Sequence, residues 1–147
     1  MNKNLLFVLA CTLTSLKSAS ADLVGHWTFE SGTELKDSTG NFPDLLLMGD
    51  AEVKDGKLAI NGAGTDASGW AITDSDSGEY QGPDIIDKTL VSWVTLQSLE
   101  DVAKAGSAIT IDRVSADIFD GIIYAERQPN RWMNGSSGFQ RTEDFDP

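Results

Sequence analysis

The chain has very little of the chemistry on which most enzyme and metal sites depend. It holds one cysteine and one histidine among 147 residues, and 11 lysines and arginines against 23 acids. A zinc site of ordinary composition needs several Cys or His ligands, so that class is excluded. The net charge of −12 opposes binding to phosphate backbones and anionic lipids, so we expect neither nucleic acid nor a membrane surface as a partner.

The first 21 residues have the pattern of a secretory signal peptide. Lys3 supplies the positive start, residues 5–16 form an apolar run, and Ala19-Ser20-Ala21 gives a cleavage motif before Asp22. That run is shorter than the roughly 20 residues that a membrane-spanning helix needs. The residues before Cys11 also resemble a short lipobox, which makes lipoprotein processing there the alternative. We therefore expect a secreted or cell-surface protein.

Removal of that leader leaves 126 residues with no cysteine at all, because the only one is Cys11. We then expect neither a disulfide nor a thiol nucleophile in residues 22–147, although an exported protein could form disulfides. The leader contains two lysines and no acid, so the net charge of the remainder is −14. This length suits one domain with a modest core. Of the acids, 16 are aspartate, which favours turns and oxygen-ligated cations.

Short apolar runs alternate with clusters of Gly, Asp, Ser and Asn, and no helical period is evident. This pattern predicts an all-β fold, an antiparallel β-sandwich. One helical turn could form at residues 98–104. The sequence stops in the polar run 131–147, and no closing strand is expected after it. Strands are expected at residues 23–29, 57–60, 70–73, 88–99, 107–112 and 119–126.

The segment at residues 88–99 has the strongest strand pattern in the chain. Leu90, Val94 and Leu96 fall on one face, and Val91 and Trp93 fall on the other. Because both faces carry bulky apolar side chains, the pattern predicts a central strand that is covered on both sides. Trp93 is therefore expected in the core, and Trp27 is expected there by the same alternation in residues 23–29.

Four short motifs follow one another along the chain: VGHWTF at 24–29, DSTGN at 37–41, GKLAING at 56–62 and TLVSWVTL at 89–96. Together they resemble bacterial laminin G-like domains of the concanavalin A-like jelly-roll superfamily. The resemblance implies a jelly roll over residues 22–147 in a larger exported protein. Such domains usually continue with strands that close the second sheet, so we expect a partial domain.

Catalytic constellations are weak in this sequence. A nucleophilic triad needs a base, and His26 is the only histidine. By strand parity it lies opposite Trp27 and Phe29, which favours a half-packed strand residue. Glucanases of the jelly-roll superfamily carry two glutamates on one strand as Glu-x-Asp-x-Glu, and no such pattern occurs here. We therefore expect no enzyme, and a glycoside hydrolase of the same fold is the alternative.

The turn at residues 37–44 is the strongest candidate for a cation. In laminin G-like and related lectin domains the matching turn often holds a structural calcium, so the resemblance points to Asp37, Asn41 and Asp44 as calcium ligands. The acidic stretch at residues 74–79 is a weaker candidate, because it lacks the distal glutamate of an EF-hand loop. No other cofactor is expected.

Sugar recognition usually depends on aromatic rings beside planar polar groups. Trp70 and Trp132 lie next to Gly69 and to Asn134-Gly135, and Arg131 precedes the second tryptophan. These three residues are the predicted ligand contacts. The sequence thus favours a non-catalytic extracellular module that binds carbohydrate or a cell-surface protein. A purely structural or adhesive module is the remaining alternative.

Overall fold

We describe the fold from a computed structural model. It describes residues 21–60, 69–97, 106–113, 116, 118–138 and 140–143. These residues form antiparallel strands and contain no helix, so the all-β prediction is confirmed. The strands are β1 (Leu45–Met48), β2 (Glu52–Lys54), β3 (Lys57–Ala59), β4 (Trp70–Thr73), β5 (Gly106–Asp112), β6 (Phe119–Tyr124), β7 (Trp132–Ser136) and β8 (Gln140–Arg141).

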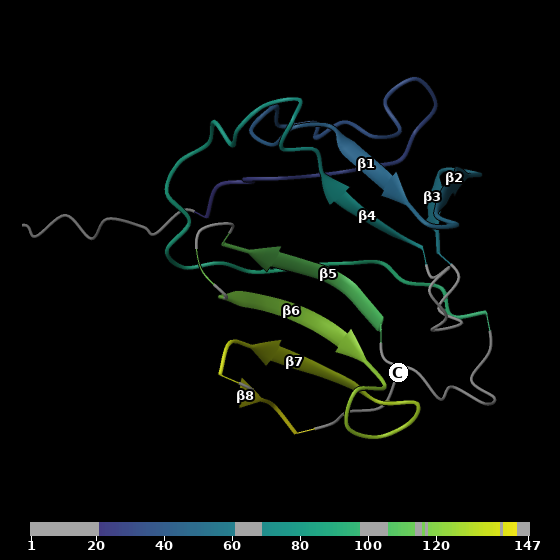
Figure 1. The fold of residues 1–147 in the computed structure, drawn as a ribbon, viewed down its shortest axis with the longest axis vertical. Coiled ribbons are helices and arrows are strands. Elements are labelled where there is room, and N and C mark those ends of the chain that lie inside the picture. The colour runs from purple at the N-terminus through teal and green to yellow at the C-terminus, as the bar shows by residue number, and fades with distance from the viewer. Residues whose placement is uncertain are drawn as a thin grey trace, which may run out of the picture.

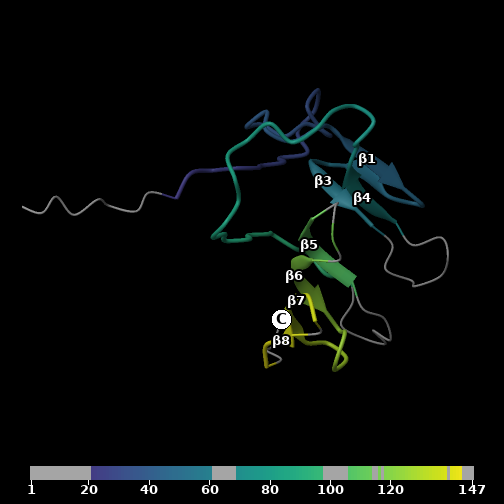
Figure 2. The same cartoon turned by 60° about the vertical axis from the view of Figure 1, so that its left-hand side comes forward.

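The described strands form three antiparallel sheets. β1 pairs with β4, β2 pairs with β3, and the third sheet has the order β5-β6-β7-β8. The two small sheets lie together at one end of the molecule and the four-stranded sheet lies at the other (Figures 1 and 2). After β4 the chain swings around one side and returns along β5 (Figure 1). The part of this link that runs back along the sheet, residues 86–97, is the returning segment, and it forms one side of the candidate site.

The β2–β3 hairpin is built on its turn residues. Asp55 and Gly56 both have positive φ, at 52° and 70°. Two central residues with positive φ define a type I′ turn, whose twist matches that of paired strands, and Asp-Gly is a preferred sequence for it. The prediction of a strand at 57–60 is confirmed as β3, and the same turn accounts for its partner β2, which the sequence analysis missed.

The core of the described residues sits on the four-stranded sheet. Ile123, Tyr124 and Met133 are its buried apolar side chains, and Met133 is fully buried. Ile123 on β6 pairs directly with Met133 on β7, so these two side chains share one face. The predicted strands at 107–112 and 119–126 are confirmed as β5 and β6, and the one at 70–73 as β4.

Residues 23–29 do not form the predicted strand. Their backbone bonds to a turn instead of to a neighbouring strand: the His26 carbonyl accepts from the Ser38 amide at 2.8 Å, and the His26 amide donates to Asp37. Phe29 also has a φ of 58°, which ends any extended run. The strand pattern was overridden because the polar turn offers its own donors and acceptors.

The predicted central strand at 88–99 is also absent from the part that is described, residues 88–97. These residues run extended beside β5 without ladder pairing. Trp93 is 89% exposed, so its prediction as a core residue was wrong, whereas Trp27 is half-buried against Phe42 at a centroid distance of 5.3 Å. Apolar bulk on both faces predicted two covering layers, but no layer covers the Trp93 face among the described residues.

Two strands within the polar run 131–147 were not predicted: β7 and β8 continue the sheet beyond β6. The alternation of buried and exposed residues in β7 was hard to recognise in the sequence. Its two buried positions are Met133 and Gly135, and a glycine has no apolar side chain to mark the buried face. The predicted signal peptide, apart from Ala21, and the helical turn at 98–104 lie outside the described residues.

Candidate functional site

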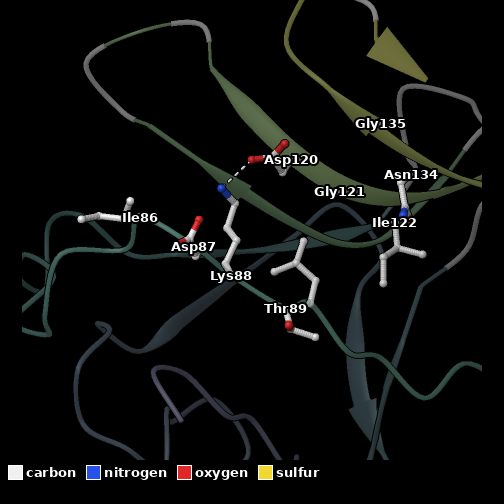
Figure 3. A pocket seen from close by; sticks show the side chains of 10 residues that line it. Ile86, Asp87, Lys88, Thr89, Asp120, Gly121, Ile122, Asn134 and Gly135 are labelled. Carbon is white, nitrogen blue, oxygen red and sulfur yellow. Dashed lines mark ion pairs between the residues drawn. The ribbon is translucent and has the colours of Figure 1, made fainter. Parts of the chain in front are cut away.

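A pocket of about 480 Å³ lies between the returning segment and the four-stranded sheet. Its volume falls within the range of small-ligand sites, about 300–1,000 Å³. One wall is the segment from Ile86 to Leu90, and the floor comes from β6 and β7 (Figure 3). The residues lining it are Ile86, Asp87, Lys88, Thr89, Leu90, Asp120, Gly121, Ile122, Asn134 and Gly135.

Strand register explains why polar and apolar groups meet on this floor. Asp120, Ile122 and Tyr124 alternate onto one face of β6, and their partners on β7 are Ser136, Asn134 and Trp132. Direct cross-strand partners point to the same side of a sheet. The carboxylate of Asp120 and the amide of Asn134 therefore lie on the same face as the apolar side chain of Ile122.

An aromatic pair continues the same face beyond the pocket. The rings of Tyr124 and Trp132 are 4.8 Å apart at their centroids and tilted by 50°. Tyr124 is buried and Trp132 is half-buried. The Tyr124 hydroxyl donates to the side-chain oxygen of Asn130 at 3.3 Å. Trp132 thus lies one cross-strand pair away from Asn134, beside the polar floor.

An ion pair connects the returning segment to the sheet. Lys88 Nζ lies 2.6 Å from Asp120 Oδ2 and spans from the wall to the floor (Figure 3). The two side chains are 29% and 39% exposed, so water screens the pair and its contribution to stability is small. The pair shows that the wall lies within side-chain reach of β6 at this point.

The predicted ligand contacts are divided between two sheets. Trp70 lies on β4, is 48% exposed and pairs across the ribbon with Met48. Arg131 and Trp132 lie at the start of β7, where the Arg131 carbonyl accepts from the Ala125 amide at 2.8 Å. Of the predicted contacts, Trp132 is the one on the pocket face.

The polar residues that line the pocket were missed by sequence reasoning. The Asn134-Gly135 dipeptide suggested a loop, yet both residues lie within β7. Asp120 was not among the predicted contacts, and it forms an ion pair with Lys88. One sequence signal could have revealed this face of the pocket. Trp132, Asn134 and Ser136 alternate with the buried Met133 and Gly135, as residues on the two faces of a strand do.

The turn at 37–44 is organised by a buried carboxylate. Asp37 is 7% exposed. Its Oδ1 accepts from the backbone amides of His26 at 2.7 Å and Thr39 at 3.1 Å. Its Oδ2 accepts from the amides of Asn41 and Phe42 and from the Thr39 hydroxyl, at 2.9, 3.0 and 2.5 Å. One side chain thus ties the start of the domain to the turn.

The same geometry bears on the calcium prediction. A carboxylate has about four lone-pair positions, and five donors already surround Asp37. The side-chain amide of Asn41 donates to the Val24 carbonyl at 2.9 Å. As folded, the turn does not present Asp37 as a ligand with free oxygens, so the fit to calcium is poor.

No group of three or more His, Cys, Asp or Glu that could hold a metal occurs among the residues that the structure describes. Calcium at Asp37, Asn41 and Asp44 stays a prediction from the sequence, and the occupied oxygens of Asp37 disfavour it.

His26 makes one side-chain contact that the sequence did not suggest. Its Nδ1 lies 3.0 Å from Ser38 Oγ in an exposed position. The neighbouring Asp37 accepts from the backbone amide of His26 and not from its ring. In a triad the acid orients the imidazole itself. The contact therefore lacks the acid that would align a base.

Arg141 and Glu126 form an ion pair in which the arginine side chain is buried. Arg141 Nη2 donates to Glu126 Oε1 at 2.8 Å and Nε donates to Oε2, so the contact is bidentate. The side chains are 7% and 25% exposed. This pair lies outside the pocket and is assigned a structural role.

No family model, curated protein or solved structure matches the chain. The described residues also contain no helix that is long and apolar enough to span a membrane.

Proposed function

We propose that the chain is a non-catalytic extracellular module that binds carbohydrate in the pocket between residues 86–90 and the four-stranded sheet. The observation that supports this proposal is the composition of the pocket face. The planar polar groups of Asp120 and Asn134 flank the apolar Ile122, and the Tyr124–Trp132 pair lies next to them. Sugars offer hydroxyl groups to such polar groups and C–H faces to apolar and aromatic surfaces.

The negative charge of the pocket and of the whole chain limits which carbohydrates could bind. The pocket is lined by Asp87, Lys88 and Asp120, which sum to one negative charge, within a chain of net charge −12. A uronic acid or sulfated polysaccharide would be repelled by this field. The proposed ligands are therefore neutral polysaccharides or their oligosaccharides.

A polysaccharide panel tests this proposal at the level of the whole protein. We expect retention on immobilised neutral glycans such as xylan, mannan or β-glucan, and none on alginate or a sulfated galactan. Asn134→Ala should weaken binding about tenfold, because one good hydrogen-bonding contact accounts for roughly 1.4 kcal/mol. Gln140→Ala is the matched control, since it removes an exposed amide from β8. Absence of binding to every neutral glycan would overturn the proposal.

A glycoside hydrolase remains the second candidate, because Asp87 and Asp120 both line the pocket. Hydrolysis needs an acid and a second carboxylate on either side of the scissile bond. Asp120 Oδ2 is already engaged by Lys88. Release of reducing sugar from the same panel, abolished by Asp87→Asn or Asp120→Asn, would favour the enzyme over the binding module.

We further propose that the described sheets belong to a laminin G-like jelly roll and that the protein is exported through its N-terminal signal peptide. The antiparallel strands and the returning segment are compatible with one half of such a sandwich. If the module does not bind carbohydrate, the alternative partner is an extracellular or cell-surface protein. Detection of a mature N-terminus at Asp22 in the culture medium would support export, and retention of residues 1–21 would contradict it.

The calcium prediction has its own test. Given the occupied carboxylate of Asp37, we expect the thermal midpoint to stay within about 1 °C between buffers with 2 mM calcium and with chelator. A bound structural ion at ten times its Kd would instead add about 1.4 kcal/mol. A calcium-dependent rise of several degrees, lost in Asp44→Ala, would show that the turn rearranges to hold the ion.

A further inference from the structure

The extended segment from Thr89 to Gln97 has an exposed apolar face. Trp93 is 89% exposed, Val91 57% and Val94 46%. Leu90 and Leu96 are half-buried, and the Ser92 hydroxyl lies 3.5 Å from the Ala108 carbonyl. Leu90 and Leu96 thus face the body of the protein, and Val91 and Trp93 face outward.

The backbone of this segment has unused pairing capacity. None of residues 89–97 forms a backbone–backbone hydrogen bond with another residue in the part that the structure describes. The segment contains no proline, no glycine and no charge, and is rich in β-branched and aromatic residues. An extended segment with these properties is a template for pairing with another strand.

The distribution of charge favours a second copy of the chain as the partner of this segment. A second copy of the chain carries the same net charge of −12, so two copies repel wherever acids face each other. The interval from Thr89 to Gln97 is free of charge, so two copies can meet there. A basic partner protein would instead gain more on the acidic surfaces.

The sequence of the segment is self-complementary about Ser92. In an antiparallel pair of identical strands centred there, Val91 of one copy lies opposite Trp93 of the other, twice. Leu90 then faces Val94, and Thr89 faces Thr95. Aromatic–β-branched and Thr–Thr pairs are among the favourable cross-strand pairs. We propose that residues 89–97 form a two-fold symmetric dimer interface by antiparallel strand pairing, with Ser92 on the axis.

Cysteine cross-linking tests this register. The only native cysteine is Cys11, so Ser92→Cys in a Cys11→Ser background introduces a thiol that faces its own copy across the axis. Mild oxidation should convert most of the protein to a disulfide dimer. Ser77→Cys, on an exposed loop, is the control and should not. Thr95→Cys alone should form no disulfide dimer and should cross-link only when mixed with Thr89→Cys, because residue 95 of one copy faces residue 89 of the other.

Sedimentation measures the association itself. The full chain should shift from monomer to dimer with concentration, and Trp93→Lys should raise the dissociation constant about 30-fold or more, since each copy contributes one Trp–Val pair. The unfolding midpoint of the monomer should not change, because Trp93 is exposed. A monomer at up to about 1 mM, or equal cross-linking of Ser92→Cys and Ser77→Cys, would overturn the proposal.

Discussion

Replacement of Asp37 by alanine should lower the free energy of unfolding by about 3 kcal/mol. Five donors lose their acceptor: four backbone amides and the Thr39 hydroxyl. A hydrogen bond to a charged group contributes about 1.5–3 kcal/mol, and a buried donor left without a partner adds its own penalty. For a domain whose total stability is in the range of 5–15 kcal/mol, this loss is severe.

Chemical denaturation, read together with amide exchange, checks this result. The exchange protection of the Asn41 and Phe42 amides should fall, because both donate to Asp37 Oδ2. Asp76→Ala is the matched control, since it removes the same charge from an exposed position. Equal denaturation midpoints for the two variants would show that the carboxylate does not hold the turn.

The same group predicts a pH dependence. Burial alone raises the pKa of Asp37, but hydrogen bonds from the Thr39 hydroxyl and from the amides of His26, Phe42 and Thr39 outweigh it and hold the pKa below its ordinary value. The unfolded chain therefore binds a proton first as pH falls. The stability that Asp37 contributes is complete above about pH 4 and is lost as pH falls through the lower folded value. The difference between wild type and Asp37→Ala should shrink accordingly below pH 4.

Replacement of Arg141 by alanine is the second large effect and should clearly lower the midpoint of chemical denaturation, because it removes both bonds to Glu126. Removing one side of an ion pair leaves the other charge without its partner. Water screens part of this loss, because the Glu126 side chain is 25% exposed. Arg141 Nη1 also donates to the carbonyls of Ser136 and Gln140, both at 3.0 Å, and the guanidinium lies 5.6 Å from the Phe119 ring centroid.

Lysine at this position separates charge from geometry. Arg141→Lys keeps the cation but loses the fork that bonds Glu126 at two oxygens, so it should recover less than half of the loss. Arg113→Ala is the control, because Arg113 is exposed and directly follows β5. A double-mutant cycle of Arg141→Ala with Glu126→Ala should return a clear coupling between the two side chains. Additive effects would show that the two side chains act independently.

Strand formation could be predicted where local sequence and tertiary pairing agree. β3, β4, β5 and β6 were found because alternation and flanking turn residues mark them. The prediction at 23–29 failed, and so did the prediction at 88–99 over its described part, 88–97, because strand propensity does not supply a partner strand. In the first segment Asp37 and its neighbours bond the backbone groups, and in the second no ladder forms. β1 and β2 were not predicted. Both are short, and each pairs with a strand that the sequence did predict, β1 with β4 and β2 with β3.

The candidate site was only partly accessible from the sequence. Trp132 was identified as an exposed aromatic near a loop and lies on the pocket face. Asp120 and Asn134 come from different strands, and their shared face depends on the β6–β7 register, which a single sequence does not reveal. The contact between Lys88 and Asp120 could not be predicted either, because Lys88 begins the segment that was wrongly predicted as a strand. Sites assembled from distant segments need the fold before they can be seen.

Chemical-shift mapping of the protein labelled with nitrogen-15 tests the proposed sugar site most directly. Neutral hexasaccharides of xylose, mannose and glucose are titrated in turn, with an alginate oligosaccharide as the charged control. The proposal predicts saturable shifts of the Gly121, Ile122, Asn134 and Gly135 amides with at least one neutral sugar, and none with alginate. No saturable shift with any neutral sugar, or shifts confined to the exposed Trp70 and Trp93 regions, would contradict the assignment of the pocket.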